Sequence, residues 1–163
     1  MTIKKGFIFI FFQFALTSIS FSQHLNMDDY DIFINDTLIS KSDFIKKSST
    51  LDSGRQKRLM FKPIKDGQKT IYYLNGALYG QGEIRNKKEI GFWVYWYENG
   101  KKAREGNFLE GKREGMHAYW YANGNLRGTG HFKNDRYDGK WTMYNEDGSQ
   151  AIEQIYKNGE LIK

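Results

Sequence analysis

The chain has 163 residues, a formal net charge of +6 and no cysteine. The absence of cysteine excludes disulfides, thiolate metal sites and a lipid anchor on cysteine. Aromatic residues make up 17% of the chain, and 17 glycines stand beside one proline, a composition that favours strands joined by tight glycine turns.

The first 22 residues have the pattern of a secretory signal peptide. Lys4 and Lys5 precede an apolar run over residues 7–19, and Ser20 and Ser22 place small residues at the −3 and −1 positions of a cleavage site. We therefore predict cleavage between Ser22 and Gln23 and a secreted or periplasmic protein. The run is short for a membrane span, which needs about 20 apolar residues, and an uncleaved anchor is the alternative.

Residues 23–66 precede the repetitive part of the chain. Two β-prone runs, at 32–34 and 37–39, flank Asn35–Asp36 and predict a small hairpin. The segment is either a degenerate cap of the repeat array, with Asp52–Ser53–Gly54 as its turn, or a separate subdomain. Terminal repeats are often atypical because one side faces water.

Three further expectations concern the same segment. Residues 41–47 are expected to form a short helical turn with Phe44 and Ile45 directed inward. Residues 48–58 have the composition of a linker or loose loop. Pro63 favours an edge position for the strand that it ends.

A 24-residue period dominates the rest of the chain. It separates Gly76, Gly100, Gly124 and Gly148, and also Gly67, Gly91, Gly115 and Gly139. A fixed period in this range indicates a repeat architecture. We predict that residues 67–163 form an all-β fold, an elongated single-layer antiparallel meander of 24-residue β-hairpin repeats.

The repeat at 91–111 predicts its own register. Asn99–Gly100 is the sequence of a type I′ turn, which would place Tyr97 opposite Lys102, Tyr95 opposite Arg104 and Trp93 opposite Gly106. A large ring opposite a glycine is expected to cover the backbone there, and His117 opposite Gly130 repeats the pattern, whereas Trp141 faces Gln154. The positions to which we assign a structural role are Gly76, Trp93, Gly100, Gly106, Gly115, Gly124, Gly130, Gly139 and Trp141.

These residues resemble a known repeat. The patterns Trp93-x-x-Trp96-Tyr97-x-Asn99-Gly100 and Glu105-Gly106-x-Phe108-x-x-Gly111-Lys112-x-x-Gly115 resemble the MORN-repeat variant of bacterial proteins, often called the YwqK-type antitoxin family. The resemblance covers roughly residues 67–163, with Asn145 in place of tyrosine and Gln154 in place of glycine in the last unit. It implies a twisted β-meander used for contacts.

No catalytic constellation is visible in the sequence. The three histidines have no metal-ligand spacing, no serine lies in a nucleophile elbow, and His117 occupies a slot that is tryptophan in neighbouring repeats, which favours packing. We expect no enzyme activity, no cofactor and no metal. Short basic runs such as Lys46–Lys47 and Arg55–Arg58 are too scattered for nucleic acid.

The aromatic residues on the sheet face opposite Trp93 are the candidate partner contacts: Tyr72, Trp96, Trp120 and Tyr144. Cross-strand packing is the simpler interpretation of these rings. The leading functional hypothesis is an exported, non-enzymatic scaffold in the cell envelope with an unidentified protein partner. The alternatives are an antitoxin or immunity protein and, more weakly, binding to a membrane surface or a glycan.

Overall fold

The computed structural model describes residues 8–10, 27–47 and 59–163. The chain divides into two compact units, Met1–Ile64 with Ile71–Gly76 and Lys65–Thr70 with Ala77–Lys163. In the described ranges no helix is long and apolar enough to cross a membrane. The predicted cleavage site at Ser22–Gln23, the linker at 48–58 and its turn at Asp52–Gly54 lie outside the described residues.

The first unit contains the predicted hairpin. Strands β2 and β3 pair antiparallel, with Ile34 opposite Thr37. Asn35 and Asp36 both take positive φ, at 50° and 66°, as a type I′ turn requires. The hairpin prediction is therefore confirmed. The elements of this unit are β1 (Ile8–Ile10), η1 (Met27–Asp29), β2 (Tyr30–Ile34), β3 (Thr37–Ile39), α1 (Lys41–Lys47), β4 (Leu59–Pro63) and the end of β5 (Gly67–Tyr72).

Strand β4 corrects the edge prediction. It pairs with β2 along its whole length, and its residues Leu59–Phe61 also pair with β1 on the other side. Only Lys62 and Pro63 lie beyond the β1 pairing, so the edge position holds for these two residues and not for Leu59–Phe61. Strand β1 falls inside the segment predicted to be a signal peptide.

A small core closes the first unit. Ile32 and Phe61 are buried, and Phe44 of α1 packs edge-on against Phe61 with ring centroids 6.4 Å apart. The inward direction of Phe44 is confirmed, but Ile45 is exposed. The residue of α1 that is buried beside Phe44 is Asp43. Its carboxylate accepts the Leu74 backbone N–H at 2.6 Å and pairs with Lys47 at 3.0 Å. These contacts compensate for the cost of burying the charge.

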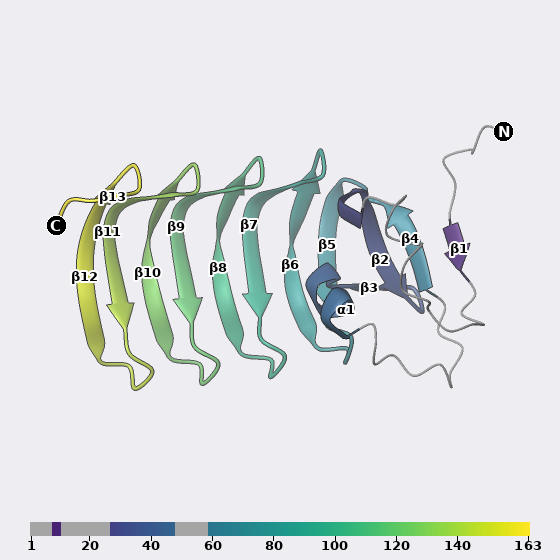
Figure 1. Cartoon of the computed structure of the whole chain (residues 1–163), viewed down its shortest axis with the longest axis horizontal. Helices are drawn as coiled ribbons and strands as arrows, with labels where there is room; N and C mark the ends of the chain where they lie inside the picture. The colour runs from purple at the N-terminus through teal and green to yellow at the C-terminus, as the bar shows by residue number, and fades with distance from the viewer. Residues whose placement is uncertain (1–7, 11–26, 48–58) are drawn as a thin grey trace. The chain divides into compact units, whose positions relative to one another are not determined.

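The second unit is an antiparallel meander in which consecutive strands lie side by side (Figure 1). The predicted all-β meander of hairpin repeats is confirmed. Its strands are β6 (Leu78–Arg85), β7 (Lys88–Trp96), β8 (Lys102–Leu109), β9 (Lys112–Trp120), β10 (Leu126–Lys133), β11 (Arg136–Tyr144), β12 (Gln150–Lys157) and β13 (Glu160–Leu161).

The turns of the second unit are of two kinds, one at each end of the strands. At one end are two-residue turns in which both residues take positive φ: Asn86–Lys87, Glu110–Gly111, Asn134–Asp135 and Asn158–Gly159. At the other end, the Gly100 N–H donates to the Tyr97 carbonyl at 2.9 Å and the Tyr97 N–H donates to the Lys101 carbonyl at 2.8 Å. That pattern is a three-residue loop.

The predicted type I′ turn at Asn99–Gly100 is therefore wrong. Only Gly100 takes a positive φ there, as expected when a type I turn is followed by a glycine bulge. Asn99 contributes through its side chain instead: Oδ1 accepts the Lys101 N–H at 3.0 Å and Nδ2 donates to the Ala122 carbonyl at 2.8 Å. The prediction of a type I′ turn did not take these side-chain hydrogen bonds of Asn99 into account.

The extra residue shifts the register next to the turn. Trp96, and not Tyr97, lies opposite Lys102. Beyond this bulge the predicted pairs Tyr95–Arg104 and Trp93–Gly106 are confirmed. The pairs His117–Gly130 and Trp141–Gln154 are confirmed as well.

A second bulge bends each long strand. Between β8 and β9, His117 lies opposite Gly106 and Glu114 opposite Asn107, so Gly115 and Met116 have no partner in that register. Gly91, Gly115 and Gly139 all take positive φ at this position. Bulges bend a strand, and each strand continues here in a new direction toward its two-residue turn.

Candidate functional site

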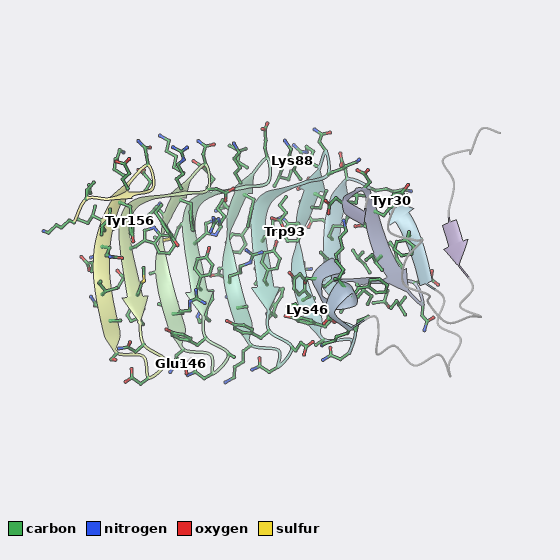
Figure 2. All side chains as sticks on the ribbon, in the orientation of Figure 1. Tyr30, Lys46, Lys88, Trp93, Glu146 and Tyr156 are labelled. Carbon is green, nitrogen blue, oxygen red and sulfur yellow. The ribbon has the colours of Figure 1, made fainter. Side chains whose placement is uncertain are left out.

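One face of the second unit carries a row of large rings, here called the ring face: Trp93, Tyr95, His117, Tyr119 and Trp141. Side chains alternate between the two faces of a sheet, and the pairing of these residues with Gly80, Arg104, Gly106, Gly128 and Gly130 places them on the same face. Figure 2 shows Trp93 midway along the strands, with Lys88 and Glu146 at opposite ends. Trp93, His117 and Trp141 are almost fully buried.

Each of these three rings lies over a glycine of the preceding strand. A Cβ added to Gly82 would lie 2.2 Å from the Trp93 indole, one on Gly106 would lie 2.2 Å from the His117 ring, and one on Gly130 would lie 2.3 Å from Trp141. The prediction of a ring over a glycine is right in kind, but Trp93 covers Gly82 and not Gly106, and His117 covers Gly106 and not Gly130.

Hydrogen bonds explain the choice of glycine. Trp93 Nε1 donates to the Glu83 carbonyl at 3.0 Å, and Trp141 Nε1 donates to the His131 carbonyl at 2.9 Å. His117 makes the equivalent bond from Nε2 to the Asn107 carbonyl at 2.8 Å. Each bond draws its ring over the strand before it. The predicted packing role of His117 is confirmed, and burial lowers the pKa of its imidazole.

On the ring face, Arg104 of β8 lies between Tyr95 of β7 and Tyr119 of β9. Its guanidinium lies over the Tyr95 ring, 3.9 Å from the centroid, and Arg104 also pairs with Tyr119 of the next strand. Burial, followed by the charge and hydrogen bond of Glu89, raises the pKa of the Tyr95 hydroxyl. Tyr95 is thus enclosed by charged groups that serve the fold.

The equivalent of Arg104 in the next repeat is Gly128, and a trough opens there. Gly128 lies between Tyr119 and Met143 in the pairing of β9, β10 and β11, with no side chain to fill that width. The trough has a volume of about 400 Å³. Its lining consists of Arg113, Tyr119, Tyr121, Arg127, Gly128, Tyr137, Trp141, Met143, Tyr144, Asn145, Ala151 and Ile152.

The two arginines of the trough differ in their surroundings. Arg113 lies over Phe132 at 4.0 Å and donates to Asp135 Oδ1 at 2.8 Å. Slight burial opposes the effect, but the hydrogen bonds from Arg113 keep the pKa of Asp135 below its ordinary value. Arg127 is exposed, and within the described part of the chain no carboxylate pairs with it.

The predicted contact residues are distributed over different surfaces. Trp96 and Trp120 are half-buried on the face opposite the ring face, where Lys102 Nζ lies 4.8 Å from the Trp120 ring. Tyr144 lines the trough. Tyr72 belongs to the first unit, where its carbonyl accepts the Ser40 N–H at 2.7 Å. The structure does not bring the four together.

Sequence reasoning missed the trough and ten of its twelve lining residues, Arg113, Tyr119, Arg127, Gly128 and Met143 among them; only Tyr144, as a candidate contact, and Trp141, as a structural position, were singled out. A signal was present, because Arg104 and Gly128 are 24 residues apart, so the loss of a large side chain at one repeat position can be read from the sequence. Its consequence also depends on the bulge at Gly115, which is expected, because the recurrence of Gly67, Gly91, Gly115 and Gly139 between hairpins predicts turns or bulges there. Among the described residues, no three His, Asp or Glu side chains cluster in a way that could hold a metal.

Comparison with known proteins identifies the repeats. Three segments, residues 91–110, 113–134 and 137–158, match the MORN repeat variant. The last of them includes Asn145 and Gln154, and the first unit at 67–90 is outside the matched segments. No curated protein matches the chain.

Proposed function

We propose that the protein is an interaction scaffold whose trough holds part of a protein partner. Repeats of the matched kind generally mediate contacts with proteins or membrane lipids, and such a meander is not a typical enzyme fold. The observation that carries the proposal is the trough at Gly128, where the rings of Tyr119 and Trp141 and the cation of Arg127 line an open space.

The trough has the features of a binding site. It combines the rings of Tyr119 and Trp141 with the polar groups of Arg113, Arg127 and Asn145, and burial of aromatic surface beside a few polar groups favours binding. The same width is filled by Arg104 one repeat earlier, so the fold does not require it to be empty. We infer that a partner's side chain takes that place.

The decisive experiment compares the two faces of the sheet. Tagged wild type, Gly128→Arg and the double variant Trp96→Ala/Trp120→Ala are used to isolate partners from the native host, after circular dichroism has shown that each is folded. We expect Gly128→Arg to lose the partner and the double variant to keep it. The opposite result would place the partner on the Trp96 and Trp120 face, and identical partners for all three would refute both sites.

We also propose that the protein is exported to the cell envelope. The support is the order of residue types in residues 1–22, where two lysines are followed by an apolar run and then by small residues at the expected cleavage site. Mass spectrometry of the protein purified from its host is expected to find Gln23 at the amino terminus. A chain that begins at Met1 would contradict cleavage.

Membrane-surface binding is a second candidate function. Three apolar side chains on the face opposite the ring face are more than half exposed, Phe92 at 53%, Leu109 at 60% and Met116 at 51%. Co-sedimentation with anionic liposomes at low salt tests this candidate, with Phe92→Ser/Met116→Ser as the variant. Unbound protein would eliminate it.

The antitoxin or immunity role remains a hypothesis that no contact in the described structure supports. Its test is genetic: deletion of the gene is expected to harm the cell only where a neighbouring toxin gene is intact.

A further inference from the structure

The missing side chain at Gly128 defines the shape of what the trough can hold. In the preceding repeat, the Arg104 side chain lies between Tyr95 and Tyr119 and stacks on Tyr95 at 3.9 Å. Gly128 lies between Tyr119 and Met143 in the same way. The space therefore accepts one side chain of about that breadth, stacked against Tyr119.

The backbone conformation at Gly128 does not require a glycine. Gly128 does not take positive φ, and the atoms nearest to an added Cβ would be the Thr142 carbonyl oxygen at 3.2 Å and the Met143 side chain at 3.7 Å, neither of them part of a ring. By contrast, the Cβ positions of Gly82, Gly106 and Gly130 are occupied by rings. Among these four glycines, Gly128 is thus the one whose nearest neighbours are a carbonyl oxygen and a methionine and not a ring.

Charge defines the second property of the occupant. The lining holds two arginines and no carboxylate. Asp135 already pairs with Arg113, whereas the exposed Arg127 has no acidic partner among the described residues. A cationic side chain at Gly128 would be repelled by Arg127, so the occupant that stacks on Tyr119 is apolar or aromatic, and a neighbouring group is anionic.

On the basis of the proposed function, we propose that the trough binds an acidic peptide segment of the protein partner, with an apolar or aromatic side chain over Gly128 and a carboxylate paired with Arg127. A peptide supplies both groups on neighbouring residues. Arginine favours carboxylates because its planar fork can donate two parallel hydrogen bonds. The stack on Tyr119 repeats with a partner's side chain the contact that Arg104 makes within the chain.

Peptide selection tests this proposal without knowledge of the partner. A phage-displayed library of random 12-residue peptides is selected on the purified protein, and the best binder is synthesised for fluorescence anisotropy. We expect selected peptides that combine Asp or Glu with an adjacent apolar or aromatic residue. No binders, or binders without acidic enrichment, would overturn the proposal.

Three variants separate charge from shape. Arg127→Glu is expected to raise the Kd about tenfold or more, whereas Lys133→Glu, the same charge change at an exposed residue of β10 outside the trough, changes it less than about twofold. Gly128→Arg is expected to abolish binding although it adds a positive charge. Equal effects of Arg127→Glu and Lys133→Glu, or tighter binding by Gly128→Arg, would refute the docking geometry.

The outcomes also distinguish this inference from the proposed function. If Gly128→Arg loses the native partner while no acidic peptide binds, the scaffold function stands and the acidic segment falls. If phosphatidylglycerol vesicles bind in a manner that Arg127→Glu abolishes, and peptides do not bind, the occupant is anionic lipid and the peptide proposal is wrong.

Discussion

At the scale of single residues, two glycines of β10 have different surroundings. Gly130 is covered by the Trp141 indole, whereas a Cβ on Gly128 would meet the Thr142 carbonyl oxygen at 3.2 Å and the flexible Met143 side chain at 3.7 Å, although both glycines lie on the ring face of β10. We predict that Gly130→Ala lowers the free energy of unfolding by about 2 kcal/mol or more, because the new methyl group would displace the indole. Gly128→Ala should cost clearly less. Urea denaturation of both variants checks the difference, and equal losses would contradict the assigned contacts.

His117 makes stability depend on pH. Burial lowers the pKa of its imidazole, nearby Arg113 and Arg104 act in the same direction, and the bond to Asn107 opposes them. As the pH falls, His117 in the unfolded chain therefore takes up a proton near its ordinary pKa of 6.5. His117 in the folded chain takes up a proton only at a lower pH. The contribution of neutral His117 is fully present above pH 6.5 and is lost as the pH falls from there through the folded-state pKa.

The matched control for this prediction is His117→Trp, which restores the side chain found in the same slot at Trp93 and Trp141. Its urea midpoint is expected to fall less between pH 7.5 and pH 5.5 than that of the wild type, since the variant lacks the buried proton acceptor. The same fall in both proteins would show that His117 is not the source of the pH dependence.

At the scale of elements, side chains of one three-residue turn bind the backbone of the next. The Tyr97 hydroxyl donates to the Trp120 carbonyl at 2.6 Å, and the Tyr121 hydroxyl donates to the Tyr144 carbonyl at 2.8 Å. Asn99 and Asn123 donate in parallel to Ala122 and Glu146. The third of these turns has Asn145 and Asp147 in the same slots.

We predict that Tyr121→Phe lowers the free energy of unfolding by about 1 kcal/mol, the usual net value of a lost hydrogen bond. Tyr144→Phe is the control, since its hydroxyl makes no hydrogen bond among the described residues, and it should change stability by less than about 0.5 kcal/mol. Thermal unfolding of the two variants measures the contrast. A larger effect of Tyr144→Phe would show that the turns are not coupled by this hydroxyl.

The 24-residue period was enough to predict the strands, the hairpins and the pairs in the middle of each repeat. It failed next to Asn99, because the sequence Asn-Gly suits both a two-residue turn and a three-residue loop, and long-range bonds to Ala122 favour the loop. It also failed to choose between Gly82 and Gly106 under Trp93, since both neighbours are glycine and the Glu83 carbonyl decides.

At the scale of the second unit, rings couple each hairpin to the one before it, and Gln154 ends the series. Gln154 occupies the repeat position of Gly82, Gly106 and Gly130, and its side chain accepts the Tyr156 hydroxyl at 2.8 Å. A further ring could not lie over this position as Trp141 lies over Gly130. The mismatch that weakened the resemblance in the last unit is thus consistent with the end of an array.

The candidate site was harder to predict than the fold. The sequence indicated aromatic rows on both faces and favoured Trp96 and Trp120, because a single-layer sheet was expected to leave that face partly exposed. The open surface on the ring face results from one missing side chain at Gly128 and from bends at internal glycines. The bends at Gly91, Gly115 and Gly139 follow the 24-residue period and were predicted as turns or bulges. The missing side chain at Gly128 departs from the repeat, and the pattern alone does not show what space such a departure opens.

Photo-crosslinking from adjacent positions of β11 tests the central claim most directly. A photoreactive benzoylphenylalanine replaces either Met143, which lines the trough, or Thr142, which lies on the opposite face, and each folded variant is irradiated in its native host. We predict a discrete crosslinked protein from position 143 and none from position 142. A partner captured from position 142 alone would contradict the assignment of the trough as the functional surface.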